Sequence, residues 1–214
     1  MVQNEPPRRR GRPPAFDRDE VLLKARDAFW RSGYAATSLD DLAAATGLNR
    51  PSLYGAFGDK RTLYLATLER TRADMIGALE RALAAPGPLR PLLARLYAAT
   101  VQLYLRGDPV GRGCFLVGTA VTEAAVENEV RAVLTLSFEQ LDGAFEAKFR
   151  TATRELPPGT DPVVHAKLAT GMLHTLAVRA RGGASEAELQ AVADAAVGMI
   201  CGPEATGAKN QHDL

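Results

Sequence analysis

The sequence predicts an all-α fold of about nine helices. Apolar residues recur at intervals of three and four through most of the chain, which is the pattern of helices with one buried face. Segments rich in Pro and Gly interrupt this pattern at 85–88, 107–109 and 156–159, where helices are expected to end. No segment alternates apolar and polar residues as a half-buried strand would.

Composition and cysteine content limit the class of protein. Of the 214 residues, 46% are hydrophobic and 24% are charged, which is typical of a globular chain. No window approaches the ~18 consecutive apolar residues of a membrane span, and the N-terminus lacks the apolar core of a secretory signal. We therefore expect a cytoplasmic protein without a membrane partner. Cys114 and Cys201 are far apart and not at metal-ligand spacing, so we expect two buried thiols, no metal and no cofactor.

The nucleophilic, titratable and metal-ligating residues do not suggest an active site. We find no nucleophile beside a base, no glycine-rich phosphate loop and no metal-ligand spacing. Glu123, Glu127 and Glu129 are close in sequence, but they are expected at a helix start, where acidic side chains interact favourably with the helix dipole. An all-α enzyme is therefore the weakest of the functional hypotheses.

Positive charge is concentrated at the N-terminal end. Residues 1–62 carry a net charge of +3 and residues 63–214 a net charge of −2, against +1 for the whole chain. Residues 1–15 are expected to be a disordered basic arm, in which Arg10 and Arg12 flank a glycine in a segment that resembles an AT-hook core. Such a strip can lie in a narrow minor groove. The alternative is a disordered leader that raises only non-specific affinity for a polyanion.

Capping signals locate the first four helices. The expected N-caps are Asp17 for the first helix, Thr37 or Ser38 for the second, Asn49 or Arg50 for the third, and Asp59 for the fourth. Pro51 fits the first turn of the third helix, where its missing N–H costs no hydrogen bond. The fourth helix is expected to run to about residue 84.

The rest of the chain predicts five more helices and a flexible tail at 202–214. The helices are expected at about 89–106, 112–125, 127–154, 161–181 and 185–201. The helix at 161–181 carries apolar residues at helical spacing: Val164, Leu168, Met172 and Leu176. We expect a DNA-binding domain at 16–62 and a ligand-binding and dimerisation domain at 63–201.

The stretch 39–57 has the arrangement of a helix-turn-helix. Two short helices meet at Gly47, and their apolar residues can be buried between them. The second helix then presents four polar side chains at its outer side or end: Asn49, Arg50, Ser52 and Tyr54. Such a helix fits the major groove, where Arg50 could pair with a guanine and Asn49 could read an adenine. Lys60, in the first turn of the next helix, could hold a phosphate.

Around this motif the sequence resembles the DNA-binding domain of the tetracycline-repressor (TetR) family. The resemblance covers about residues 16–65 and includes TSLDDLAAATGL at 37–48, PSLY at 51–54 and FGDK at 57–60. It implies double-stranded operator DNA as a partner, with contacts from Asn49, Arg50, Pro51, Ser52, Tyr54 and Lys60 and backbone support from Ser38. Many relatives carry a bulkier pair in place of Gly55 and Ala56, often with a histidine second, so one base or phosphate contact is expected to be missing.

The same resemblance implies a homodimer and a small-molecule effector. TetR-like proteins pair through the last two helices of each subunit, which would place two recognition helices ~35 Å apart on a palindromic operator. An effector cavity is expected among the helices between residues 63 and 181, and the helix at 60–84 would transmit its occupation to the DNA-binding helices. The candidate effector contacts are Tyr97, Thr100, Tyr104, Cys114, Phe115, Thr119, Phe138 and His174.

Two interpretations of the C-terminal half stay open at this point. It could sense a small molecule, or it could serve only dimerisation or a protein partner. Cys114 lies in the segment RGCFL at 112–116, which resembles a motif in one branch of these regulators. Its thiol is either an inert part of the core or a reactive sensor.

Overall fold

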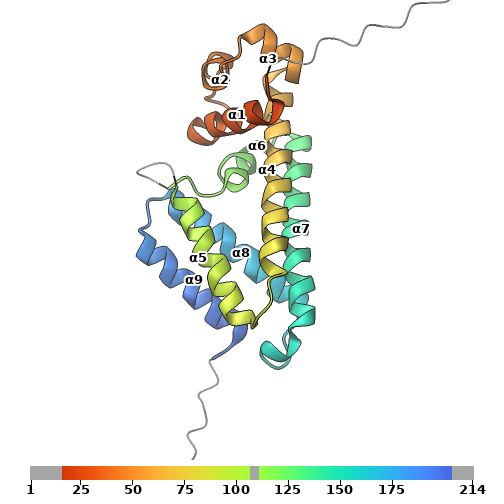
Figure 1. Cartoon of the computed structure of the whole chain (residues 1–214), viewed down its shortest axis with the longest axis vertical. Helices are drawn as coiled ribbons and strands as arrows, with labels where there is room; N and C mark the ends of the chain where they lie inside the picture. Colours follow the sequence, from red (N-terminus) through yellow and green to blue (C-terminus); the bar gives the residue numbers. More distant parts are fainter. Residues whose placement is uncertain (1–15, 107–110, 204–214) are drawn as a thin grey trace, which may run out of the picture.

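The computed structural model describes residues 16–106 and 111–203, and all regular structure within these ranges is helical (Figure 1). The helices are α1 (Arg18–Ser32), α2 (Leu39–Thr46), α3 (Arg50–Phe57), α4 (Lys60–Leu83), α5 (Leu89–Leu105), α6 (Val121–Glu123), α7 (Asn128–Thr151), α8 (Pro162–Arg181) and α9 (Glu186–Cys201). A π-helix (Leu116–Ala120) precedes α6, and a 3₁₀ turn (Thr153–Glu155) follows α7. The all-α prediction is confirmed. The predicted arm at 1–15 and the tail from 204 lie outside the described residues.

Capping side chains start the first four helices where the sequence predicts them. Side-chain oxygens accept hydrogen bonds from first-turn backbone N–H groups in each case: Asp17 for α1, Ser38 for α2, Asn49 for α3 and Asp59 for α4. Thr37 does not cap α2, because it is buried and its hydroxyl donates to the Gly33 carbonyl at 2.6 Å. Gly47 ends α2 with a φ of 75°, a left-handed conformation that costs glycine little.

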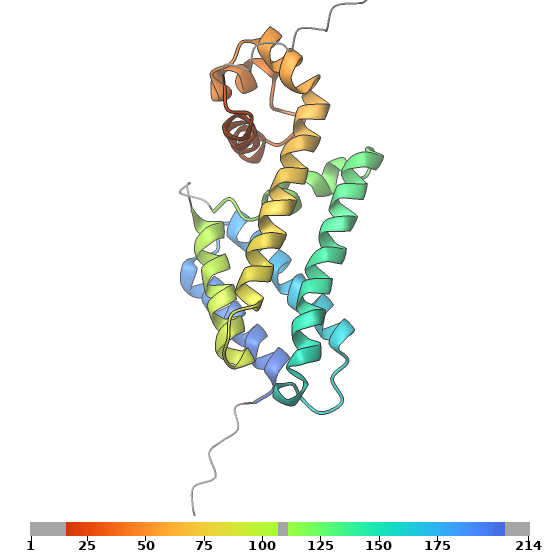
Figure 2. The ribbon, with the colours of Figure 1, turned by 45° about the vertical axis from the view of Figure 1, so that its right-hand side comes forward.

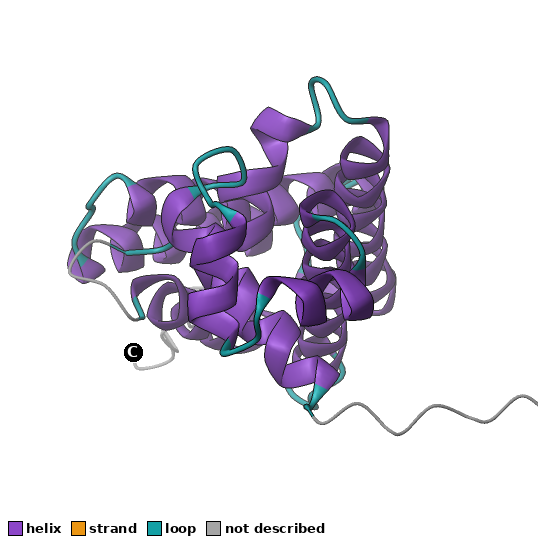
Figure 3. Cartoon of the chain, turned by 90° about the horizontal axis from the view of Figure 1, so that it is seen from above, coloured by secondary structure: helices purple, strands orange, loops and turns teal. Residues whose placement is uncertain are grey.

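A long central helix joins a small helical unit to a larger bundle. The helices α1, α2 and α3 form the small unit at one end of the molecule, and α4 runs from it into the bundle (Figures 1 and 2). Within the bundle α7 packs against α4 and α8, and α9 packs against α5 and α8. Seen along the long axis, the described residues form helices joined by loops, with no strand among them (Figure 3). None of the described helices is long and apolar enough to cross a membrane.

The helix α4 contributes to the core of both units. Near its start Tyr64 packs edge-on against Phe29 of α1, with ring centroids 5.0 Å apart. Farther along, Leu79 and Leu83 are buried in the bundle. Each such buried side chain stabilises the fold by roughly 1.5–3 kcal/mol through removal of apolar surface from water. A rigid-body shift of α4 would therefore move both units together.

The prediction of one helix at 112–125 is wrong. Residues 111–114 have no regular secondary structure, and only from residue 115 does the chain turn helical, first as the π-helix and then as α6. Gly113 has a φ of 65°, and a Cβ at this position would collide with the carbonyl oxygen of Ala177. The close approach of this segment to α8 holds it out of a helix.

Burial differs along α8 and between the two cysteines. Of the apolar residues predicted on α8, Leu176 is buried, but Val164 and Leu168 expose 50% and 54% of their surface. These positions lie one turn apart and form an outward apolar face on α8. The thiol of Cys114 is buried as predicted, whereas that of Cys201 is half-buried.

Candidate nucleic-acid interface

The helix α3 buries one face and presents the other outward. Leu53 and Phe57 are buried against the small unit, with 2% and 4% of their surface exposed. The predicted DNA contacts Arg50, Pro51 and Tyr54 are exposed, and Tyr54 exposes 49% of its surface. Ser52 lies between these faces and is half-buried. The arrangement agrees with a helix whose polar N-terminal end is presented to a partner.

Arg50 is held by an acidic side chain at the start of the neighbouring helix α2. Its Nε donates to Asp40 Oδ1 at 2.6 Å, and its second guanidinium nitrogen donates to Asp40 Oδ2. The hydrogen bond from Arg50 lowers the pKa of the Asp40 carboxyl below its usual value. Both side chains are exposed to solvent, which screens the pair, so Arg50 can exchange Asp40 for a base or phosphate at small cost.

The predicted contacts Asn49, Ser38 and Lys60 each have a partner within the protein. The amide oxygen of Asn49 accepts from the Ser52 N–H at 2.9 Å, so a bidentate contact to adenine would have to share this oxygen with the cap. The side chain of Ser38 is held in a capping box by Asp41. Lys60 Nζ lies 4.5 Å from the Tyr34 ring centroid, at the start of α4.

Basic residues near this surface include one that the sequence analysis did not select. Arg18 opens α1, and its guanidinium donates to the Ala56 carbonyl of α3 at 2.5 Å. Its position directly after the basic arm was the only signal in the sequence. Arg10 and Arg12 lie outside the described residues.

An aromatic cluster joins the small unit to the bundle. Tyr64 of α4 lies between Tyr34 and Phe115, with ring centroids 4.6 and 6.2 Å away. Its hydroxyl donates to Thr119 Oγ1 at 2.9 Å. Burial raises the pKa of Tyr64 well above its ordinary value, so its hydroxyl stays protonated and available as a donor. Phe115 and Thr119, selected as effector contacts, therefore lie at the junction between the two units.

A second junction connects α1 to α8 through the segment 111–114. Trp30 Nε1 at the end of α1 donates to the Arg112 carbonyl at 3.0 Å. Arg181 at the end of α8 donates to the carbonyls of Trp30 and Arg112, at 3.1 and 3.4 Å. The helix at 60–84 is the connection predicted from the sequence, and this cluster provides another physical connection between the units.

Four of the predicted effector contacts line one enclosed cavity in the bundle: Tyr104, Cys114, Phe138 and His174. The space open inside is only about 10 Å³, close to the minimum for one water molecule. Burial lowers the pKa of His174 and raises that of Cys114, so both are neutral at pH 7. Tyr97 and Thr100 do not line this cavity, and their hydroxyls donate to the Ala169 and Leu96 carbonyls.

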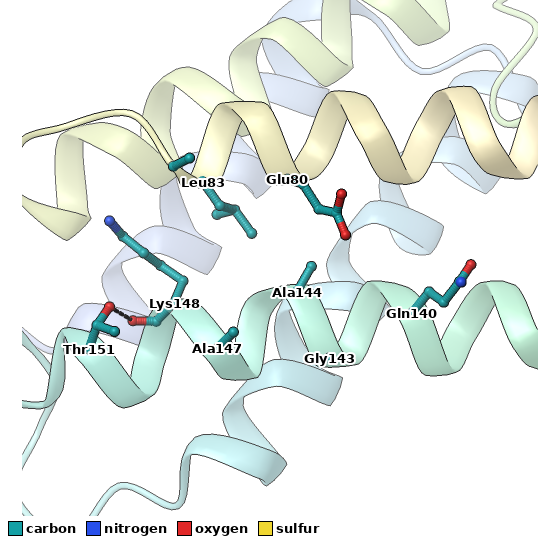
Figure 4. A pocket seen from close by; sticks show the side chains of 9 residues that line it. Glu80, Leu83, Gln140, Gly143, Ala144, Ala147, Lys148 and Thr151 are labelled. Atoms are coloured by element: carbon teal, nitrogen blue, oxygen red, sulfur yellow. Dashed lines mark hydrogen bonds between the residues drawn. The ribbon is translucent and has the colours of Figure 1, made fainter.

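A larger groove of about 590 Å³ opens on the surface between α4 and α7 (Figure 4). Glu80 points into it from α4, and Lys148 reaches across from α7. The small side chains of Ala144 and Ala147 leave the space between the helices open. None of the predicted effector contacts lines the groove. Among the described residues no cluster of three or more His, Cys, Asp or Glu side chains is placed to hold a metal ion.

Comparisons with known proteins identify the family. Residues 21–67 match the family model of bacterial regulatory proteins, tetR family. Over 188 residues the chain is 32% identical to the HTH-type transcriptional repressor ComR of Escherichia coli K12, which covers 86% of this chain and 89% of ComR. The chain belongs to the TetR family of transcriptional regulators.

Another relative and a solved structure support the assignment. An uncharacterized HTH-type transcriptional regulator of Bacillus subtilis, YezE, is 30% identical over 135 residues, which are 63% of this chain and 69% of YezE. The TetR-family regulator CifR, solved as a cysteine mutant with 26-base-pair double-strand operator DNA, superimposes with a TM-score of 0.73 at 31% identity. The match covers 87% of this chain and 98% of CifR. This TetR-family chain thus shares its fold with a protein whose structure contains DNA.

Proposed function

We propose that this TetR-family chain is a ligand-responsive transcriptional repressor that binds a palindromic operator as a homodimer. The observation that carries the proposal is the outward polar end of α3, with Arg50 and Tyr54 exposed while Leu53 and Phe57 anchor the helix. ComR is named a repressor, and the CifR structure contains operator DNA. A protein that regulates transcription in this way would act in the cytoplasm, where the operator lies.

DNA binding is assigned to residues 16–62 and to the arm before them. Arg50 would read a base, and the other contacts would fix the helix on the backbone: Ser38, Asn49, Pro51, Ser52, Tyr54 and Lys60. Arg10 and Arg12 of the arm would enter the adjacent minor groove. A helix of 10–12 Å diameter fills the major groove, so its flanks meet phosphates on both strands.

Dimerisation is assigned to α8 and α9. The side chains of Val164, Leu168 and Val178 expose 50–60% of their surface on one face of α8, and Met199 exposes 74% on α9. Two helices with such faces can pair with their copies in a second subunit as a four-helix bundle. Pairing would remove this apolar surface from water and place two copies of α3 on one side of the dimer.

Effector sensing is assigned to residues 63–201, with the enclosed cavity as its centre. An apolar ligand would have to widen a space of about 10 Å³ by displacing the side chains of Tyr104, Cys114, Phe138 and His174. Because Cys114 lies two residues after Arg112, whose carbonyl binds Trp30 and Arg181, such displacement would reach α1 as well as α4. The small size of the cavity also favours a second candidate, a DNA-binding regulator without an inducer.

Selection of genomic DNA fragments by the purified protein tests the proposal. We expect enrichment of a palindrome whose half-sites lie about one helical turn apart. A thermal-shift screen of small apolar compounds then separates the two candidates, since a ligand that binds only the folded protein raises its Tm. Recovery of no preferred sequence would overturn operator binding, and a screen without a stabilising compound would favour the regulator without an inducer.

A further inference from the structure

A hollow on the surface of the small unit lies between α3 and the start of α1. It has a volume of about 360 Å³ and is lined by Phe16, Arg18, Ser52, Gly55 and Ala56. The hollow exists because α3 carries no large side chain here. A Cβ added at Gly55 would meet no atom within 4 Å. Neither Gly55 nor Ala56 can reach a DNA backbone, so Ser52 is the one residue of α3 lining this hollow with a polar side chain for a phosphate.

The guanidinium of Arg18 is fixed at the edge of the hollow. It donates to the Ala56 carbonyl at 2.5 Å, and its Cζ lies 4.3 Å from the centroid of the Phe57 ring. These contacts connect α1 to the C-terminal end of α3 and restrict the side chain before any partner arrives. One hydrogen bond uses only one of the five N–H groups of a guanidinium, and the others can bind phosphate oxygens.

Arg18 has no carboxylate partner among the described residues, although three acidic side chains surround it in sequence. Asp17 accepts from the backbone N–H groups of α1, Asp19 pairs with Arg70, and Glu20 pairs with Lys24. The positive charge of Arg18 is therefore not neutralised within this part of the protein. A partner that brings negative charge to this hollow would neutralise it.

We infer that Arg18 binds a phosphate of the DNA backbone at the flank of α3, in the place that Gly55 and Ala56 leave open. The inference rests on the proposed function, because α3 must enter the major groove for this phosphate to reach the hollow. Arg18 then acts as a positioning residue: it fixes the angle of α3 in the groove and reads no base. The contact extends the DNA-binding surface from α3 to the start of α1, which follows the basic arm in the sequence.

The salt dependence of DNA binding tests this inference. Each phosphate contact contributes about −0.9 to the slope of log K against log [salt]. The dimer brings two copies of Arg18 to the duplex, so Arg18→Ala is expected to make the slope less steep by about 1.8. The loss of affinity caused by Arg18→Ala would then be about 60-fold larger at 0.1 M than at 1 M salt. The probe is a fluorescein-labelled duplex of about 30 base pairs and random sequence, long enough for two half-sites. Fluorescence anisotropy measures the affinity.

Two matched variants separate the contact from general charge and from folding. Arg31→Ala removes the same charge from an exposed position at the other end of α1 and is expected to keep the wild-type slope. Arg18→Lys keeps the charge but not the planar guanidinium, and it should restore most of the slope. If Arg18→Ala and Arg31→Ala have equal salt slopes, the inference about Arg18 is overturned. The proposed function is still supported in that case, because the wild-type protein binds DNA.

Two further outcomes have distinct meanings. If the wild-type protein shows no salt-sensitive binding to any duplex, the proposed function fails and the inference fails with it. If inorganic phosphate raises the Tm of the wild-type protein but not of Arg18→Ala, while both bind DNA with equal slopes, the hollow binds free phosphate and the DNA contact is overturned.

Discussion

We expect Leu168→Asp to convert the protein from a dimer to a monomer. Leu168 exposes 54% of its surface at the centre of the outward face of α8, between Val164 and Val178. A carboxylate buried there against a second subunit would have no partner, and burial of an unpaired charge is strongly unfavourable. Light scattering after size exclusion should give a mass near 22.9 kDa for the variant and twice that for the wild type.

The affinity for the operator should fall when Leu168→Asp dissociates the dimer. A monomer engages one half-site and loses the effective concentration that joins the two, so a loss of at least 100-fold is expected. Leu103→Asp is the matched control, because Leu103 on α5 exposes a similar 52% of its surface outside the proposed interface. This variant should remain dimeric. Equal dissociation of both variants, or a dimeric Leu168→Asp, would contradict the assignment of the interface.

We expect Gly113→Ala to destabilise the junction between α1 and α8. The new methyl group would collide with the Ala177 carbonyl, and the φ of 65° is itself unfavourable for alanine. A cost of about 3 kcal/mol would lower Tm by roughly 6–12 °C in a chain of this size. Trp30 is the sole tryptophan of the chain, and its indole N–H donates to Arg112, so its emission should shift to the red as the segment moves.

Gly118→Ala provides the control for this prediction. Gly118 lies in the π-helix only five residues away, has no positive φ, and leaves open space where a Cβ would stand. This variant should keep the Tm within about 2 °C and leave the emission of Trp30 unchanged. The role assigned to the segment 111–114 would be contradicted by a Gly113→Ala variant that unfolds and fluoresces like the wild type.

The features predictable from the sequence are those set by neighbouring residues. The caps Asp17, Ser38 and Asn49 act on N–H groups two or three positions away, so a short stretch of sequence contains the whole interaction. The same holds for the outward face of α3, which follows from the helical spacing of its two buried residues, Leu53 and Phe57. Local chemistry therefore located the candidate interface.

Features that depend on distant contacts could not be predicted. The irregular segment 111–114 before the π-helix depends on the close approach of Gly113 to Ala177 of α8. The position of Arg18 depends on the Ala56 carbonyl, 38 residues away. Likewise, the spacing of aromatic and polar side chains predicted eight effector contacts but could not separate those lining the cavity from Phe115 at the junction. That separation depends on how the helices pack.

The central claim is that the polar end of α3 reads a base in DNA, and paired variants on two duplexes test it most directly. We expect Arg50→Ala to bind an operator recovered from the genome about 5- to 150-fold more weakly and a duplex with scrambled half-sites almost unchanged. Lys60→Ala should weaken binding to both duplexes by the same factor. Because each subunit of the dimer loses one phosphate contact, the salt slope should become less steep by about 1.8. If Arg50→Ala loses the same affinity for both duplexes, the claim that the polar end of α3 reads a base is contradicted.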